Sequence, residues 1–576
     1  MVSIFIILIV AWLLADSFLI NKSDVSNSII PINKTEKEEI SSLIIPHFDF
    51  FKDKRQEFLK SISERTQPKQ IILVSVNHLN LGSGNIITTD QEWDFDNVKP
   101  KIDTDLINYL AFEKVITKDS TPFAEEHGIK NVIGEIAEYF SDSKITPIII
   151  KDSTSKEEVE KLINELNTNY PKSMIVSSVD FSHYNPNSLA KIHDEFSLDA
   201  LEDLNDEKIW SAETDSPQSL YVAVKWAKKT NQKFDLFYNE NSGNIQNNND
   251  SETTSTIIGS FSKNPKNTEI NTSTTFLFAG DAMFDRVVYH TFKNQGLNHI
   301  FDNLGNRVFW GSDIAMLNLE GPISEKPIDD NIQANNLNFN FPPETINVLK
   351  SLRIKQVSLA NNHTLNAGES GFMNTKAVLE KSGIKFSGSQ NSFSEDNVLR
   401  IDSKIPVSII TLDELVDLNA QQINQTIKNE KNNGRFTIIF PHWGTEYDTL
   451  HNAIQERRAK EWIDQGADLI IGSHPHVVQD IQIYKNRPII YSLGNFVFDQ
   501  YFSKETQEGL MVGGIITKDK LIISLFPTKQ VNIKPQLLSG AEKEKKIQSI
   551  ININSNAGFK KIRNDTIEID INSNSN

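Results

Sequence analysis

Carboxylate, amide and histidine side chains recur directly after short apolar, β-branched runs of this chain. In the second half, Asp281 ends TFLFAGD, Glu320 ends IAMLNLE and His363 ends VSLANNH. Carboxylate oxygen, amide oxygen and imidazole nitrogen are the ligands of Mn, Fe, Zn or Mg in hydrolytic two-metal sites, where a carboxylate bridges cations about 3.5–4 Å apart. We therefore predict a two-metal site, bridged by Glu320 or Asp281, among Asp281, Asn318, Glu320, Asn361, Asn362, His363, His442, His474 and His476.

The spacing of these residues also suggests a reaction. His474 and His476 flank one proline, so both side chains can face the same way at a strand end. His363, if it is free beside Asn362, can protonate a leaving oxygen.

The first half carries a smaller set in equivalent positions. His47 ends SLIIPH, His78 ends IILVSVNH and His183 ends MIVSSVDFSH. A facial site made by His47, His78 and a carboxylate would suit Fe(II) or Zn. A histidine after a strand can also be a hydrogen-bonded turn residue, so a polar cleft without metal remains the alternative.

These positions require strands that end at common edges. Short β-rich runs alternate with longer helical patterns, for example at 374–382 and 454–465, which predicts α/β layers. In such folds ligands gather at the carboxyl ends of strands. Each half is therefore predicted to carry one polar site at one sheet edge.

Length and composition narrow the class of protein. The 576 residues favour two to four domains. The net charge of −18 argues against a nucleic-acid partner, because such proteins need a basic face. The chain has no cysteine, which excludes disulfides, thiolate metal ligands and cysteine nucleophiles. An anionic substrate would need local positive charge, which bound metals can supply.

The N-terminus predicts a membrane anchor. Residues 2–20 read VSIFIILIVAWLLADSFLI, and nineteen helical residues span about 28 Å, close to one hydrocarbon core. The apolar core is long, no basic residue precedes it, and Ala15-Asp16-Ser17 is a poor cleavage site. We expect an uncleaved single-pass anchor at 1–21 with the remaining domains outside the cell membrane, and a cleaved signal peptide as the alternative.

Polar, low-complexity stretches divide the remainder. They predict globular domains at 38–263 and 275–553, a linker at 264–274 and a polar tail at 554–576.

Six ordered motifs of the second half form a known pattern: GDAMFDR (280–286), NLEGP (318–322), NNHTLNAGESG (361–371), PHWGTEY (441–447), GADLIIGSHPHVVQ (466–479) and YSLGNFVFDQ (491–500). They resemble the CapA family of capsule or poly-γ-glutamate synthesis proteins, which is related to calcineurin-like metallophosphatases. The resemblance implies a four-layer α/β/β/α sandwich in a surface-anchored protein of extracellular polymer synthesis. It implies His363 as the catalytic acid acting with Asp281, and metal ligands at Asp281, Glu320, Asn362, His442, His474 and His476.

Two residues depart from that pattern. Met283 stands where active phosphatases often place a histidine two residues after the first aspartate, which is expected to weaken one metal site. Asn366 stands where the family usually has aspartate.

Substrate contacts are predicted around the same motifs. Arg286 can hold a phosphate or carboxylate bidentately, with a structural salt bridge as the alternative. Trp443 and Tyr447, beside His442, can stack on a substrate, with ordinary packing around the site as the alternative. The other predicted substrate contacts are Asn318, Glu446 and Asn495.

The first half has its own motifs: LIIPHFDFF (43–51), SVNHLNLGSGNIITTDQEW (75–93), FAEEHGI (123–129), ITPIII (145–150), VSSVDFSHY (176–184) and TIIGSFSK (256–263). They resemble the Memo-like family, whose prokaryotic members are called AmmeMemoRadiSam system protein B. The resemblance implies an α/β sandwich related to class III extradiol dioxygenases, with one metal held by histidine and, in some members, cysteine. His47, His78 and His183 match histidine positions, and Asp180 and His127 lie in polar motifs. TDSPQSL (214–220) occupies the region where cysteine is expected, so a soft ligand is lost.

Three functions remain open on the sequence alone. The first is a membrane-anchored, extracytoplasmic, metal-dependent hydrolase or transferase in capsule or poly-γ-glutamate synthesis. The second is a non-catalytic component of a polymer export assembly, whose partners are the anionic polymer or other polymer-synthesis proteins. The third is a sensor, in which the Memo-like half binds a metal or small molecule.

Overall fold

The computed structural model describes residues 38–95, 98–248, 252–266, 272–305, 307–326, 332–333, 336–551, 561–563 and 565–571. The predicted anchor at 1–21 lies outside these residues, as do 267–271 of the predicted linker. Among the described helices, none is both long and apolar enough to cross a membrane. Residues Glu39–Asn576 form one compact unit.

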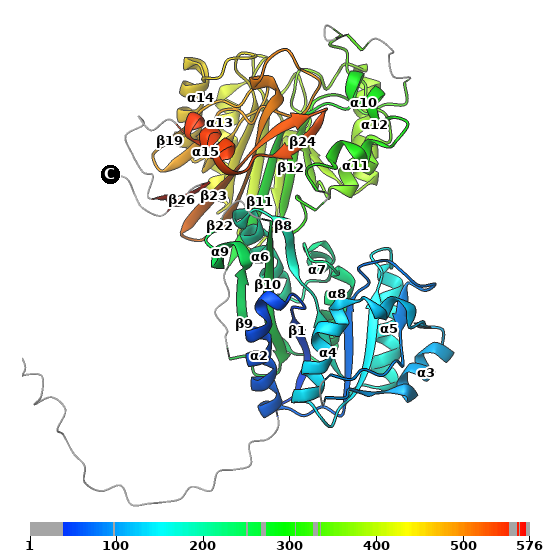
Figure 1. Ribbon diagram of the computed structural model, residues 1–576. Helices are drawn as coiled ribbons and strands as arrows, with labels where there is room; N and C mark the ends of the chain where they lie inside the picture. Colours follow the sequence, from blue (N-terminus) through cyan, green and yellow to red (C-terminus); the bar gives the residue numbers. More distant parts are fainter. Residues whose placement is uncertain are drawn as a thin grey trace, which may run out of the picture. The chain divides into compact units, whose positions relative to one another are not determined.

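The first half is built on one mixed sheet (Figure 1). Its strand order is β5-β3-β6-β2-β7-β1-β10-β8. Its central strands β1, β7, β2 and β6 run parallel, so their carboxyl ends share one edge. The strands are β1 (Ile40–Ile45), β2 (Gln70–Val76), β3 (Ile86–Thr88), β4 (Lys101–Ile102), β5 (Thr117–Lys118), β6 (Lys144–Ile150), β7 (Met174–Ser178), β8 (Phe181–Asn185), β9 (Lys233–Asn241) and β10 (Thr253–Ser262).

Helices cover both faces of this sheet, because its central strands are apolar on both sides. Ile71 and Leu73 of β2 pack in the same core as α2 and α4, while Ile72 and Val74 pack with α5 and α8. The alternation follows the two-residue period of a strand. The helices are α2 (Lys52–Arg65), α3 (Thr104–Phe112), α4 (His127–Tyr139), α5 (Lys156–Asn169), α6 (Asn187–Glu202), α7 (Asp206–Ser211), α8 (Pro217–Lys229) and the short α9 (Ser242–Ile245).

The second half contains two further sheets, of order β14-β13-β12-β11-β22-β23-β26-β25 and β15-β16-β17-β18-β20-β19. The first sheet contains β11 (Ser273–Ala282), β12 (Ile314–Leu319), β13 (Gln356–Ser358), β14 (Lys385–Ser387), β21 (Asn495–Val497), β22 (Glu508–Thr517), β23 (Lys520–Val531), β24 (Lys534–Leu537), β25 (Lys561–Arg563) and β26 (Thr566–Asp570). The second contains β15 (Val398–Ile401), β16 (Val407–Asp413), β17 (Phe436–His442), β18 (Leu469–Ile471), β19 (Ile481–Tyr484) and β20 (Arg487–Ile490).

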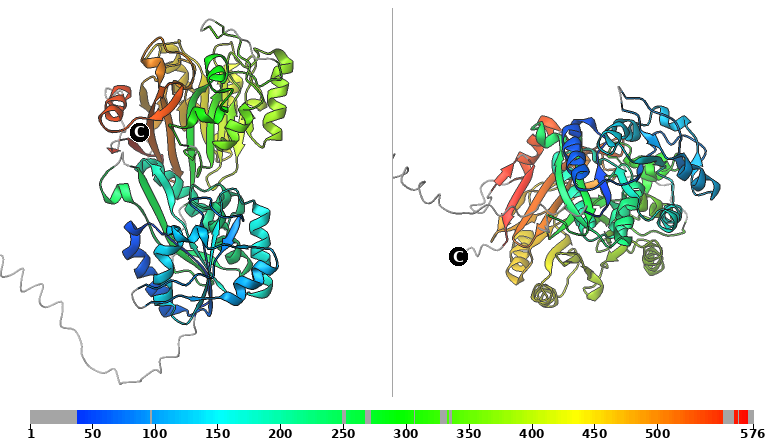
Figure 2. Two further views of the ribbon diagram at one scale, coloured as in Figure 1. Left: turned by 45° about the vertical axis from the view of Figure 1, so that its right-hand side comes forward. Right: turned by 90° about the horizontal axis from the view of Figure 1, so that it is seen from below.

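The two sheets face each other across a shared core, and helices cover their outer faces (Figure 2). Phe276 and Phe278 of β11 point into the core between the sheets, whereas Leu277 and Ala279 point into the core beneath the outer helices α10 (Arg286–Phe292), α11 (Thr345–Ser351) and α12 (Gly368–Lys381). On the other side, α13 (Ala420–Asn432) and α14 (Ala453–Gln465) cover the second sheet, and α15 (Gly540–Ile550) follows β24. The observed order of layers is therefore α/β/β/α.

Two of the predicted boundaries differ from the structure. β11 begins at Ser273, inside the predicted linker at 264–274. β26 lies inside the predicted polar tail and pairs with β23, and its Ile567 and Ile569 are buried in the core between the sheets. The alternating pattern TIEID carries this strand signal, which the surrounding Asn-rich sequence obscures.

Residues from both halves of the sequence also share one core. Leu189 and Ile192 of α6 belong to the same buried cluster as Leu277 of β11. Gly513 of β22 leaves room for this contact, since a Cβ built there would lie 2.8 Å from Cδ1 of Ile192.

Candidate metal centres

The predicted residues of the second half meet where strand ends of its two sheets converge. Asp281 lies in β11, Glu320 follows β12 directly, and His442 ends β17. We call the set Asp281, Glu320, Asn362, His442, His474 and His476 the second-half centre.

Its two carboxylates are fully buried and close together. Oδ1 of Asp281 accepts a hydrogen bond from Nδ2 of Asn318 at 2.8 Å, and Oδ2 accepts one from the backbone N–H of His474 at 3.1 Å. Oε1 of Glu320 accepts none. Burial raises the pKa of Asp281 to about 6. Burial and the neighbouring Asp281 raise the pKa of Glu320 well above its ordinary value.

The three histidines of this centre are buried and neutral. Nε2 of His442 lies 3.1 Å from Nδ1 of His474 and 2.9 Å from Oδ1 of Asn362. Nδ1 of His476 lies 3.0 Å from Oδ1 of Asn495. Burial, together with the neighbouring histidines, lowers the pKa of His442 and His476 well below the ordinary value, and that of His474 to about 4. Neutral imidazoles offer lone pairs to a cation.

The backbone around Pro475 aims two of these rings inward. The backbone φ angles of His474 and His476 are 98° and 58°. This left-handed conformation is rare for residues other than glycine. Such conformations cluster at functional sites, where surrounding structure maintains them.

Ligand atoms gather in two groups within this region. Atoms of Asp281, Glu320 and His442 lie within 4.8 Å of one another, and so do atoms of Glu446, His474 and His476. Glu446 was predicted as a substrate contact, but its carboxylate lies where it can serve as a ligand. Met283, at the position where a histidine is frequent, is fully buried, and its Sδ accepts a hydrogen bond from the backbone N–H of Asp285.

His363 borders the centre with a fixed ring orientation. Its Nδ1 lies 2.9 Å from Oδ1 of Asn366, an acceptor, so Nδ1 carries the proton. Nε2 therefore presents a lone pair, 3.9 Å from Oε1 of Glu320. Burial lowers the pKa of His363, and the Asn366 hydrogen bond opposes this shift.

Two predicted substrate contacts are engaged within the protein. Arg286 is 2% exposed and forms a bidentate ion pair with Asp499, which corresponds to the salt-bridge alternative. Trp443 is 2% exposed, stacks on Trp462 and donates its Nε1 hydrogen to the carbonyl of Tyr491, which corresponds to the packing alternative. Asn318 and Asn495 contact ligand residues, so in this structure they orient the ligands.

The first half forms a second cluster at the carboxyl ends of β1 and β2. His47 follows β1, His78 follows β2, and His127 begins α4. The His78 and His127 rings stack with centroids 3.9 Å apart, and His47 packs edge-on against both. Nδ1 of His78 lies 2.6 Å from Oε1 of Glu126, which directs Nε2 of His78 into the cluster.

An acidic pair faces these histidines. Nε2 of His47 lies 3.1 Å from Oδ2 of Asp180 and 3.0 Å from Oδ2 of Asp215. Burial alone would lower the pKa of His47, but the two carboxylates reverse this and raise it to about 9. We call the set His47, His78, His127, Asp180 and Asp215 the first-half centre.

Asp215 was not among the predicted ligands. It lies in TDSPQSL, the stretch where the family's cysteine was expected. That location could have indicated Asp215 as a ligand. Atoms of His47, Asp180 and Asp215 lie within 4.8 Å of one another. The centre thus offers a hard oxygen ligand where a soft sulfur was expected.

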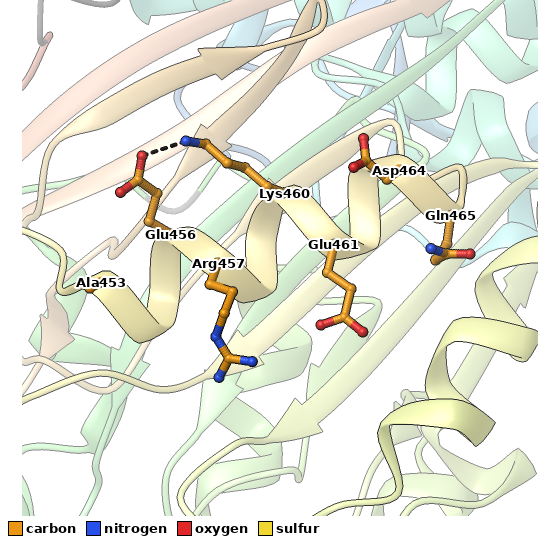
Figure 3. Close-up of a pocket in the computed structure, with 7 residues that line it drawn as sticks. All are labelled: Ala453, Glu456, Arg457, Lys460, Glu461, Asp464 and Gln465. Atoms are coloured by element: carbon orange, nitrogen blue, oxygen red, sulfur yellow. Dashed lines mark hydrogen bonds and ion pairs between the residues drawn. The ribbon is translucent and has the colours of Figure 1, made fainter.

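The first-half centre opens into a cavity of about 850 Å³. His183 lines this cavity but lies outside the groups of converging ligand atoms. A separate shallow pocket runs along α14, where Nζ of Lys460 lies 2.6 Å from Oε1 of Glu456 (Figure 3). It contains none of the predicted residues, and one exposed helix supplies its lining.

Comparisons with known proteins agree with both sets of motifs. A family model described as "Bacterial capsule synthesis protein PGA_cap" matches residues 275–500, and one described as "Memo-like protein" matches residues 20–256. "Capsule biosynthesis protein CapA" of Bacillus anthracis is 26% identical over 324 residues, which covers 52% of this chain and 79% of the relative. "PGA biosynthesis protein CapA" of Bacillus subtilis (strain 168) is 29% identical over 252 residues, covering 41% and 66%. A MEMO1 family protein of Pyrobaculum aerophilum is 26% identical over 139 residues, covering 23% and 50%. Both resemblances stated from the motifs are confirmed.

Proposed function

Because the chain joins a Memo-like domain to a PGA_cap (CapA) domain, we propose that it acts in the synthesis of a capsule or poly-γ-glutamate type polymer, with a metal-dependent hydrolase site in the PGA_cap domain. The two Bacillus relatives, a capsule biosynthesis protein and a PGA biosynthesis protein, support the polymer context. We include in this proposal a membrane anchor at 1–21, extracytoplasmic domains, and an anionic polymer or other polymer-synthesis proteins as partners.

One observation carries the metal site. Nδ1 of His476 donates to Asn495, so its Nε2 carries a lone pair, which lies 3.5 Å from the unbonded Oε1 of Glu320. When Glu320 is ionised, these two electron-rich atoms repel in a buried site, and the cost of the buried carboxylate is why its pKa is raised. A divalent cation between them would satisfy both atoms. The ligand types suit Mn, Fe, Zn or Mg, with the two groups of ligand atoms accommodating two ions.

The protein's own residues can then assist bond cleavage. Bound divalent ions supply Lewis-acid polarisation of the bond to be cleaved. His363 holds its Nδ1 proton on Asn366, so Nε2 is the atom that takes up a proton and transfers it to a leaving oxygen. Asn318 holds Asp281 in place, and Asn495 holds His476. Except for the half-buried Asn362, the set is buried, which shields the ligands from bulk water.

Metal content tests this proposal directly. The full chain, purified in detergent, should contain close to three divalent ions per chain by elemental mass spectrometry, two in the second-half centre and one in the first-half centre proposed below. Glu320→Ala and His474→Ala should each lower the content of the second-half centre, while His299→Ala, on the exposed surface, should leave it unchanged. Unchanged metal in both ligand variants would refute the assignment. Metal without turnover of a generic phosphodiester would favour the polymer-binding alternative.

We propose a single divalent ion in the first-half centre. Its histidines and the carboxylate of Asp215 resemble a 2-His-1-carboxylate set, which suits Fe(II), and the set also suits Zn. Oε1 of Glu213, which is 1% exposed and lines the same cavity, also lacks a hydrogen bond. This centre supports the sensor function as the second candidate, since a cavity of this size admits a small molecule.

The proposed topology has its own test. Protease added outside intact cells should digest the chain to a short stub. Full protection would place the domains in the cytoplasm and would exclude a surface role.

A further inference from the structure

The segment that carries Asp215 is held by residues of the PGA_cap half. This segment, Trp210–Asp215, connects the end of α7 to α8 and also carries Glu213. Glu213 and Thr214 are buried, and Thr214 forms a backbone bridge with Phe181 of β8. The conformation of this segment therefore determines where the carboxylate of Asp215 lies relative to His47.

Three donors from the second half bind backbone carbonyls of this segment. Arg307 donates from Nη1 to the carbonyl oxygen of Thr214. The backbone N–H of Gly311 donates to the carbonyl of Ser211 at 3.0 Å. Arg353 donates from Nη1 to the carbonyl of Trp210 at 2.6 Å. The guanidinium groups of both arginines also lie over the ring of Trp310, which fixes their positions.

A fourth contact acts on Glu213. The carbonyl oxygen of Val308 lies 3.1 Å from Nε2 of His193 and accepts its hydrogen, while Nδ1 of His193 lies 3.7 Å from Oε2 of Glu213. The same stretch of the second half also walls the cavity above the first-half centre, through Asn303, Leu304, Gly305, Arg307 and Val308.

We propose that the first-half centre is a composite site, in which Arg307 of the PGA_cap half is a positioning residue for the metal ligand Asp215. The inference rests on the proposed metal in that centre. Arg307 touches neither metal nor substrate; it binds the carbonyl of the residue directly before Asp215. A divalent cation in the Memo-like half therefore depends on the PGA_cap half, which couples the two domains through one segment.

The test uses the full chain and Co(II) as a spectroscopic probe. Because both centres can take Co(II), the signal of the first-half centre is defined as the part of the absorption spectrum that Asp215→Asn removes. Arg307→Ala is expected to weaken this part by roughly tenfold or more, since substitution of residues that orient ligands typically costs 10–100-fold in metal affinity. The Co(II) spectrum of the second-half centre should remain unchanged.

Two further variants separate positioning from general loss of structure. Arg307→Lys keeps one donor near Thr214 and should restore much of the affinity. Arg457→Ala, on the exposed face of α14, is the matched arginine control and should behave as wild type (Figure 3). If Arg307→Ala does not fold, Arg353→Met replaces it and is expected to weaken the same signal.

The outcomes are distinguishable. Loss of affinity in Arg307→Ala with recovery in Arg307→Lys supports the composite site. Wild-type affinity in Arg307→Ala, or in Arg353→Met where that variant replaces it, overturns the inference while leaving the metal proposal standing. If Asp215→Asn removes no part of the wild-type spectrum, the metal proposal for this centre fails, and the inference fails with it.

Discussion

Oε1 of Glu320 and Nε2 of His476 lie 3.5 Å apart in a fully buried site, and no hydrogen bond joins Glu320 Oε1 to another residue. Nε2 of His363 faces the same oxygen at 3.9 Å. This arrangement lowers the stability of the metal-free protein, as is typical of sites that bind a charged ligand.

Glu320→Gln should therefore stabilise the metal-free protein and abolish metal binding at the second-half centre. The amide cannot ionise in its buried position and can donate to the lone pair of His476. We expect a gain of about 1–3 kcal/mol, the cost typical of a buried unsatisfied group. Thermal unfolding in excess chelator measures it, with Glu344→Gln as an exposed control. A lower midpoint for Glu320→Gln together with retained metal would contradict the assignment.

Metal affinity at the second-half centre should fall as the pH falls through about 6. Burial raises the folded-state pKa of Asp281 to about 6 and that of Glu320 well above its ordinary value, so as the pH falls a metal must displace protons from both carboxyls. The histidines have lowered pKa values and remain neutral over this range, so they do not limit binding. Affinity should change by about tenfold per pH unit for each displaced proton. Calorimetric titration in two buffers of different ionisation enthalpy counts those protons; a flat affinity between pH 5 and 7 would exclude this explanation.

The first-half centre should show a different pH dependence in its metal-free form. The pKa of His47 is about 9 in the folded protein and about 6.5 when unfolded, so the fold favours its charged form. The resulting stabilisation is fully present below about pH 6.5 and is lost as the pH rises through 9. Asp215→Asn removes one of the two carboxylates, so it should lower the pKa of His47. The stabilisation should then be lost at a lower pH than in the wild type.

Nuclear magnetic resonance of the histidine ring follows that pKa directly. Glu252→Gln, an exposed carboxylate lining the same cavity, is the control and should leave the pKa of His47 nearly unchanged. An unchanged pKa in Asp215→Asn would mean that Asp180 alone holds the charge.

The sequence predicted the ligand positions better than their surroundings. Asp281 and Glu320 lie at the ends of neighbouring parallel strands of one sheet, so their meeting followed from local pattern. His442 ends β17 of the other sheet, so its approach depends on how the two sheets pack. Asp215 lies in a connection without periodicity, and nothing local shows that it faces His47. The burial of Arg286 and Trp443 likewise depends on Asp499 and Trp462, which lie 213 and 19 residues away in sequence. The core shared by α6 and β11 depends on packing between elements that no short pattern encodes.

Asn366→Asp should raise the pKa of His363 and strengthen it as an acid donor. Asn366 accepts the Nδ1 hydrogen at 2.9 Å without adding charge, so burial lowers the pKa and the imidazolium is scarce at neutral pH. A carboxylate at this position would favour the charged ring, by about one pKa unit or more. It can still accept the hydrogen bond that Asn366 receives from the backbone of Phe339. The pKa is measured by nuclear magnetic resonance in metal-loaded protein, with Asn429→Asp on the exposed face of α13 as the control, because Asn429 accepts its hydrogen bond and aspartate can do the same. If the pKa rises and turnover of a phosphodiester does not change, His363 does not transfer the proton.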